Sequence, residues 1–255
     1  MAGMRGATFG FGAVIFTITI VASGCGDSGA CADLDGEVLL TAHVTDNGER
    51  ARVEVELRRP DLAAGSIPVK LCEDHGVRVD DVVMTEVKRP SGAVIYEAEL
   101  SAVSQQEAVT LRFQLRTGDA TSEYTAVIDA PGFTITSPMA DAEVSRAASL
   151  PITWDPPRGG DAKINVKVAD EIDGDACLGE PLELEEPDNG AVEVAKAKVE
   201  LSPDMPPSDG VCAAFVTLSR THEAPLVSTS GAGSVHPDSR VEATTSRTIT
   251  FTSVP

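Results

Sequence analysis

The chain has 255 residues, of which 40 are acidic and 20 are basic, so its formal net charge at pH 7 is −20. Such acidity disfavours binding to nucleic acid and to an anionic lipid surface. Aromatic residues make up only 4% of the sequence, which leaves few rings for a platform on which bases or sugars could stack.

The first 24 residues have the organisation of an export signal. Arg5 is their single charge, an uncharged apolar run follows from Phe9 to Ala22, and the small residues Ser23 and Gly24 precede Cys25. These features match the n-region, h-region and cleavage site of a signal peptide. The run is shorter than the roughly 20 residues that span a bilayer. The stretch VASGC, which ends at Cys25, resembles a bacterial lipobox; the resemblance implies that the Cys25 thiol carries diacylglycerol and becomes the mature N-terminus.

Two alternatives to this lipoprotein signal stay open. An ordinary secretory signal could be cut near Ser23, which would leave Cys25 as a thiol, or the uncharged stretch could remain as an uncleaved anchor. Under the lipobox hypothesis residues 1–24 are removed and residues 25–36 form a lipid-anchored tether. The protein is then expected in the cell envelope, on the outer membrane rather than the inner one, held by its acyl chains.

The cysteine count agrees with export to an oxidising compartment. With Cys25 acylated, four cysteines remain, an even number that three different pairings could satisfy. Two lie in each half of the chain, which favours a disulfide within each half. The pairs expected are Cys31–Cys72 and Cys177–Cys212.

Residues 37–130 alternate between apolar and polar side chains, which is the pattern of half-buried strands. In the segment 52–58, Val53, Val55 and Leu57 face one way and charged residues face the other. About seven such runs are separated by turn sequences such as DNGE and RPSG. Seven short strands at this spacing predict an antiparallel β-sandwich.

Residues 133–255 predict a second sandwich, so the fold class expected is all-β, with two tandem domains. Alternation at 163–168 places Ile164, Val166 and Val168 inward. The segment ITSPMADAEVSRAASLPITWDPP resembles the opening of a fibronectin type III or related immunoglobulin-like domain, on the positions of four residues: Ile135, Pro138, Ile152 and Trp154. The whole arrangement is similar to envelope lipoproteins of myxobacteria-like Gram-negative bacteria.

Two segments are candidates for functional sites. Residues 170–175 bring together four carboxylates that could ligate Ca²⁺ in a loop, although the spacing is not that of an EF-hand: Asp170, Glu171, Asp173 and Asp175. Residues 219–246 show no clear strand pattern and are rich in Ser, Thr, Gly and Ala. We expect this second segment to be a mobile loop and a place for a partner contact.

The sequence favours a non-enzymatic envelope lipoprotein that acts as a binding or structural module, with no cofactor other than the candidate Ca²⁺. Histidines are few and scattered, and no nucleophile lies in a recognisable catalytic context. An envelope or extracellular protein is the expected partner. The alternatives are an exported hydrolase whose site is assembled from distant residues, and a calcium-dependent adhesion module.

Overall fold

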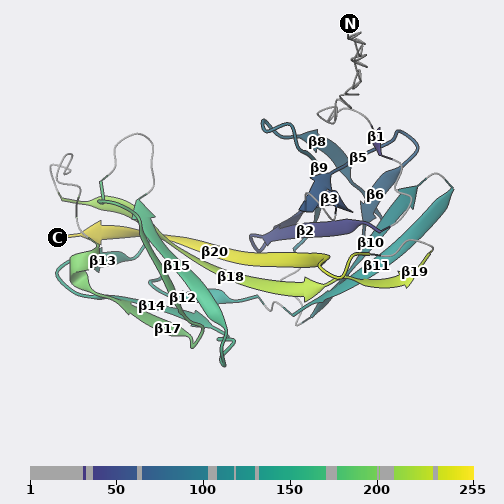
Figure 1. The fold of residues 1–255 in the computed structure, drawn as a ribbon. Helices are drawn as coiled ribbons and strands as arrows, with labels where there is room; N and C mark the ends of the chain where they lie inside the picture. The colour runs from purple at the N-terminus through teal and green to yellow at the C-terminus, as the bar shows by residue number, and fades with distance from the viewer. Residues whose placement is uncertain are drawn as a thin grey trace, which may run out of the picture.

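The computed structural model describes residues 31–32, 37–61, 65–102, 108–117, 119–129, 132–170, 177–199, 201, 210–231 and 235–255 (Figure 1). Cys25, with the expected signal peptide before it, lies outside the described residues, as do Glu171, Asp173 and Asp175. The lipidation site and three of the four candidate calcium ligands therefore remain predictions.

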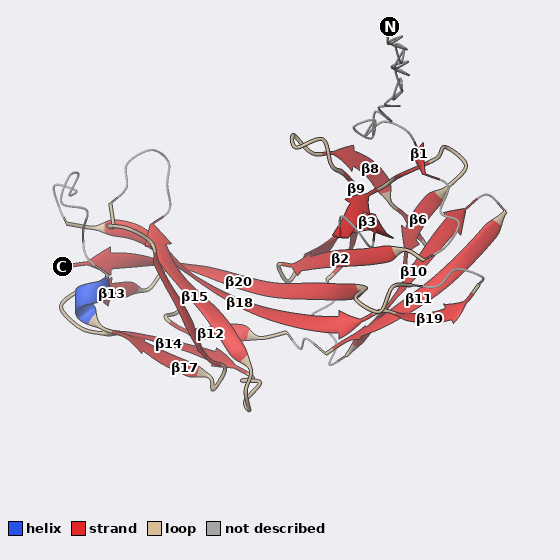
Figure 2. Cartoon of the chain, in the orientation of Figure 1, coloured by secondary structure: helices blue, strands red, loops and turns tan. Residues whose placement is uncertain are grey.

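The expected all-β class is confirmed: strands make up nearly all of the described secondary structure (Figure 2). Most strands pair in antiparallel fashion, in sheets of two, three, five and ten strands. The alternation that predicted the strands also sets their faces. Val53, Val55 and Leu57 are fully buried, while their neighbours Arg52, Glu54 and Glu56 lie on the outer face.

The molecule has two lobes, each built from two facing sheets. Lobe 1, on the right in Figure 1, contains the five-stranded sheet β19-β11-β10-β6-β7 and the strands β2, β3, β4, β8 and β9 of the ten-stranded sheet. Its strands are β1 (Cys31–Ala32), β2 (Leu39–Asp46), β3 (Arg50–Asp61), β4 (Gly65–Pro68), β5 (Lys70–Leu71), β6 (Gly76–Val79), β7 (Val82–Val83), β8 (Thr85–Lys88), β9 (Val94–Ser101), β10 (Val109–Thr117), β11 (Ala120–Ile128) and β19 (Val227–Ser230).

Lobe 2 packs a three-stranded sheet against the other half of the ten-stranded sheet. The smaller sheet has β12 (Thr134–Ser137), β14 (Leu150–Asp155) and β17 (Ala191–Val194); the larger contributes β13 (Glu143–Ser145), β15 (Lys163–Asp170) and β16 (Leu182–Pro187). Ile135, Ile152 and Trp154 are buried, as expected. After β17 the chain forms a 3₁₀ turn over Lys196–Lys198.

A long hairpin belongs to both lobes. Strands β18 (Cys212–Pro225) and β20 (Arg240–Val254) pair along their whole length. At one end Val216, Leu218 and Phe251 lie in the core of lobe 2. At the other end Ala224, Val241 and Ala243 lie in the core of lobe 1, where residues 240–245 of β20 pair in parallel with residues 41–46 of β2.

The expected division at residues 130–133 therefore does not separate the two cores. Residues 133–255 do supply the strands of lobe 2, but the part from about 221 to 243 completes lobe 1. The ten-stranded sheet runs through both lobes without interruption (Figure 1). This long-range pairing leaves no mark in local sequence, because the partners β2 and β20 are about 200 residues apart.

The expected loop at 219–246 is wrong, because most of that segment is strand. Most of its inward positions are small or polar, as Arg220, Ala224, Ala243 and Thr245 show, and the larger apolar ones are Leu226 and Val241. Its outward positions carry hydroxyl groups that pair across the hairpin, with Oγ–Oγ distances of 2.8 Å for Ser219–Ser246 and 3.2 Å for Thr221–Thr244. Apolar–polar alternation is therefore weak even though the strands are long.

Candidate functional site

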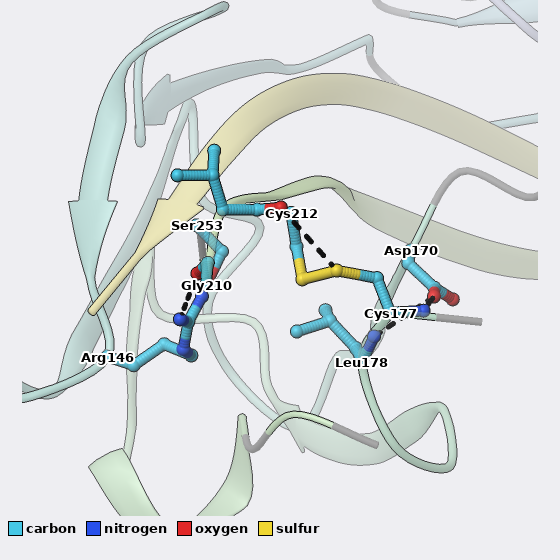
Figure 3. The surroundings of a disulfide bond; sticks show 8 residues. Arg146, Asp170, Cys177, Leu178, Gly210, Cys212 and Ser253 are labelled. Atoms are coloured by element: carbon cyan, nitrogen blue, oxygen red, sulfur yellow. Dashed lines mark hydrogen bonds between the residues drawn. A yellow bond between two sulfur atoms is a disulfide. The ribbon is translucent and has the colours of Figure 1, made fainter. Parts of the chain in front are cut away.

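The far end of lobe 2 is held by a disulfide, shown in Figure 3. Cys177 and Cys212 are bonded, with their Cα atoms 5.8 Å apart, which confirms the pairing expected for the second half of the chain. Cys212 opens β18 and is buried in the core of lobe 2. The bond therefore ties the segment before β16 to the start of the shared hairpin.

Asp170 was the first of the candidate calcium ligands, and it lies beside this disulfide (Figure 3). Its buried carboxylate accepts hydrogen bonds from the backbone N–H groups of Cys177 and Leu178. The role visible in the structure is thus to join the end of β15 to the backbone of Cys177 and Leu178. Within the described ranges, no group of three or more His, Cys, Asp or Glu side chains is placed to hold a metal ion.

The other expected disulfide, in lobe 1, is only partly described. Cys72 is disulfide-bonded, and the backbone of β1 pairs in parallel with β5, where Cys31 lies opposite Lys70. The side chain of Cys31 lies outside the described residues. The assignment of Cys31 as the partner of Cys72 therefore stays a prediction.

A buried ion pair lies in lobe 2, near the middle of the shared strand β18. Arg220 on β18 places Nε 2.6 Å from Asp188 Oδ2 and donates from Nη2 to Oδ1 at 2.9 Å. Asp188 Oδ1 also accepts a hydrogen bond of 2.7 Å from Trp154 Nε1. The Arg220 guanidinium lies 4.4 Å from the centre of the Phe133 ring, so an aromatic face covers the charge.

Sequence reasoning identified Trp154 but missed Asp188 and Arg220. The burial of Arg220 could have been predicted. Every second residue of β18 faces the core, from Ala214 through Val216 and Leu218 to position 220. An arginine at an inward strand position requires a buried carboxylate. Asp188 is in a turn between β16 and β17, and nothing local indicates that its carboxylate points inward.

A second charged cluster, more accessible to water, lies at the junction between the lobes. Arg158, in the loop between β14 and β15, donates from Nη2 to His222 Nδ1 at 3.1 Å and lies 3.5 Å from Asp129 Oδ2. Burial, and next the Arg158 guanidinium, lower the pKa of His222; the Asp129 carboxylate acts in the opposite direction. These three residues are called the junction cluster below.

The other histidines each lie against a carboxylate. His43 Nδ1 is 3.8 Å from Glu242 on the outer face of the ten-stranded sheet, and His236 Nδ1 is 3.6 Å from Asp238. His75 Nε2 is 3.6 Å from Asp74, and its Nδ1 is buried without a hydrogen-bond partner. His75 lies in the charged sequence CEDHG, yet only 6% of its side chain is exposed.

On the outer face of the ten-stranded sheet, acidic and basic side chains of neighbouring strands form ion pairs with one another. Cross-strand ion pairs join Arg52 to Glu97 at 2.6 Å in lobe 1 and Lys167 to Glu183 at 3.3 Å in lobe 2. Between the lobes, the face carries the paired hydroxyls of the shared hairpin. The result is a polar face with little local charge imbalance, which extends across both lobes.

The outer face of the five-stranded sheet carries a group of neighbouring arginines. Register places Arg78 opposite Gln114, between Arg112 and Arg116 on the neighbouring strand. Two of these guanidiniums bind backbone carbonyls of acidic turns: Arg78 binds the carbonyl of Asp81, and Arg116 that of Asp74, the latter at 2.8 Å. The arginines therefore fasten turns, and the acidic residues of those turns surround the face.

Three hollows in the described part of the protein are small or open to solvent. The cavity beneath β13 and β20 measures about 10 Å³, which is about the space of one water. Two open depressions on the ten-stranded sheet measure about 500 and 510 Å³, and their linings include the ion-paired side chains just described. Neither is enclosed in the way that is typical of a small-molecule site.

Comparison with known proteins adds little. No protein-family model matches the chain, and no curated protein matches it. Among solved structures, a Fcho1 Mu homology domain from Danio rerio with bound Eps15 peptide is similar over 87% of this chain and 97% of that one, at 9% identity and a TM-score of 0.24. No helix among the described residues is long and apolar enough to cross a membrane.

Proposed function

We propose that this chain is a non-enzymatic module of the cell envelope, tethered to a membrane through Cys25, which binds or spaces other envelope components. The observation that carries the proposal is the shared hairpin. Because β18 and β20 contribute to the cores of both lobes, the lobes form one elongated body rather than two domains joined by a flexible linker. A stiff body with a polar face suits a scaffold that holds a partner at a set distance.

The tether supports the same reading. Only five residues lie between Cys25 and Cys31, and an extended chain covers at most about 3.6 Å per residue. Lobe 1 would therefore lie within roughly 20 Å of an acylated Cys25. Lobe 2, at the far end of the hairpin, would project away from the anchor and be the part most accessible to a partner.

Membrane attachment is tested by fractionating cells that express Cys25→Ala and, as a matched control, Ser28→Ala. The C25A protein should leave the membrane fraction, because one thiol carries the anchor, and the S28A protein should stay. A C25A protein that still floats with lipid would restore the uncleaved-anchor alternative.

The binding role is tested by photo-cross-linking in the native envelope. A photoreactive residue is placed at Thr248, exposed on the ten-stranded sheet, and a second at Thr110, exposed on the five-stranded sheet. Adducts formed at one position and absent at the other would identify the contact face. Hydrolase activity of the purified chain that disappears on substituting His75 or His222 would contradict the proposal in favour of an exported enzyme.

A further inference from the structure

We propose that Arg158, His222 and Asp129, the junction cluster, form a proton-sensitive latch between the two lobes. The latch would stiffen the part of the molecule where the shared hairpin passes from one lobe to the other, which is called the waist below. The three residues come from different parts of the fold. Asp129 directly follows β11, the last strand of lobe 1 before the chain enters lobe 2; Arg158 belongs to a loop of lobe 2; and His222 is on the shared strand β18. The latch concerns the waist alone and depends on neither the membrane anchor nor a partner.

The geometry assigns the protonation state of the closed latch. Arg158 Nη2 lies 3.1 Å from His222 Nδ1, and a guanidinium can only donate hydrogen bonds. Nδ1 must therefore carry a lone pair, which places the imidazole proton on Nε2 and leaves the ring neutral. The same Nη2 is 3.5 Å from Asp129 Oδ2, so a single guanidinium nitrogen joins the shared strand to the end of lobe 1.

The charged surroundings of His222 favour that neutral state. Arg220 is two positions earlier on the same face of β18, but its guanidinium is held by Asp188. On β20, the residue opposite His222 is Ala243, which is uncharged. The charges that act on His222 are therefore one of each sign, Arg158 and Asp129. Burial and Arg158 together lower its pKa, with Asp129 opposing them, so the ring is neutral at neutral pH.

Acidification breaks the contact at one atom. A proton added at Nδ1 occupies the lone pair that accepted from Arg158, and the imidazolium then faces the guanidinium as a like charge. Arg158 must turn away from the ring, and the pair with Asp129 loses its support from β18. The lobes remain joined by β18 and β20, so the expected change is a wider range of interlobe angles rather than separation.

The test measures interlobe distances by pulsed electron spin resonance. Spin labels are attached to cysteines introduced by Thr85→Cys on β8 and Glu183→Cys on β16, both exposed positions. Cys25→Ala is added so that only the two new thiols react, and the disulfides stay oxidised. In the parent chain the distance distribution should be narrow at pH 7.5 and should broaden reversibly at pH 5.

Two variants separate the latch from a purely structural role. His222→Gln keeps a side-chain oxygen that can accept from Arg158 but does not titrate, so its distribution should stay narrow at both pH values. Arg158→Gln removes the donor, so its distribution should be broad at both. A parent distribution that is equally narrow at both pH values, or an H222Q distribution that broadens as much as the parent's, would overturn the proposal.

Thermal unfolding gives a second readout with a defined sign. Because the folded pKa of His222 lies below its unfolded value, the unfolded chain binds the proton more readily. The contribution to stability is then complete above about pH 6.5 and is lost as the pH falls through the folded pKa. The parent chain should lose melting temperature relative to H222Q over that range; parallel curves would contradict the latch.

Discussion

The two lobes differ in the size of their cores. The core of lobe 1 brings together strands of three sheets around the fully buried side chains of Leu57, Phe113 and Tyr124, and the carboxylate of Asp46 is buried at its edge. The core of lobe 2 is smaller. It contains the Cys177–Cys212 disulfide and the buried carboxylate of Asp170, as lobe 1 contains the disulfide-bonded Cys72 and the buried Asp46, and it also contains the buried Asp188–Arg220 ion pair.

The difference follows from the amount of apolar surface available to each lobe. Hydrophobic burial scales with the apolar area removed from water, so a smaller core supplies less of the folding free energy. Cross-links and buried polar contacts then fix a structure that packing alone would fix less well. The shared hairpin also couples the lobes, because a change in either core acts on the same two strands.

The largest effect should come from breaking the core of lobe 1 through the hairpin. Val241→Asp would place an unpaired carboxylate at a position with no exposed surface, at a cost of about 5 kcal/mol or more. Loss of the cooperative transition in chemical denaturation would show it. Val227→Asp is the control, because that valine is 56% exposed and its replacement should change stability by less than about 0.5 kcal/mol. If V241D leaves lobe 1 folded, the hairpin is not part of its core.

The next effect concerns the ionic element of lobe 2. Asp188→Ala should cost about 3–5 kcal/mol, because Arg220 would remain buried without a counter-charge. Urea unfolding measures the loss. Lys163→Ala, which breaks the exposed pair with Glu185, should cost at most about 1 kcal/mol. Similar losses for the two variants would mean that the Asp188–Arg220 pair is open to water.

The smallest of the three effects concerns the covalent element. The double variant Cys177→Ala, Cys212→Ala should lower the free energy of unfolding by about 2–4 kcal/mol, since the bond closes a loop with a sequence separation of 35. Calorimetry of the oxidised parent and the double variant checks this. Arg146 also holds this end of lobe 2, because its guanidinium donates to Ser253 Oγ at 2.9 Å and to the carbonyl of Gly210 (Figure 3). An unchanged melting temperature would show that the contacts of Asp170 and Arg146 are sufficient without the disulfide.

Local pattern was enough to predict strands wherever inward positions are large and apolar. This held for Val53, Val55 and Leu57 and again for Ile164, Val166 and Val168, all of them buried. Cysteine placement predicted the Cys177–Cys212 bond, because a pair within one half of the chain needs no knowledge of the fold.

The middle of the hairpin could not be predicted in the same way. Most of its inward positions hold alanine, arginine or threonine, as at Arg220, Ala224 and Thr245, so the alternation that marks a strand is faint there. Its role in lobe 1 depends on β20 pairing with β2, which a local window cannot contain. The junction cluster was missed for the same reason, because Asp129, Arg158 and His222 are brought together only by the tertiary fold.

The parallel pairing of β2 with β20 also determines how the protein would respond to a pulling force. A tether attached before β2 and a load applied to lobe 2 would draw these strands in opposite directions along their length. The six registered residue pairs from Thr41–Arg240 to Asp46–Thr245 would then be loaded together in shear instead of opening one after another. If the protein is held at a membrane by its N-terminal end and bound by a partner at lobe 2, the pairing of β2 with β20 would therefore be the contact that resists extension.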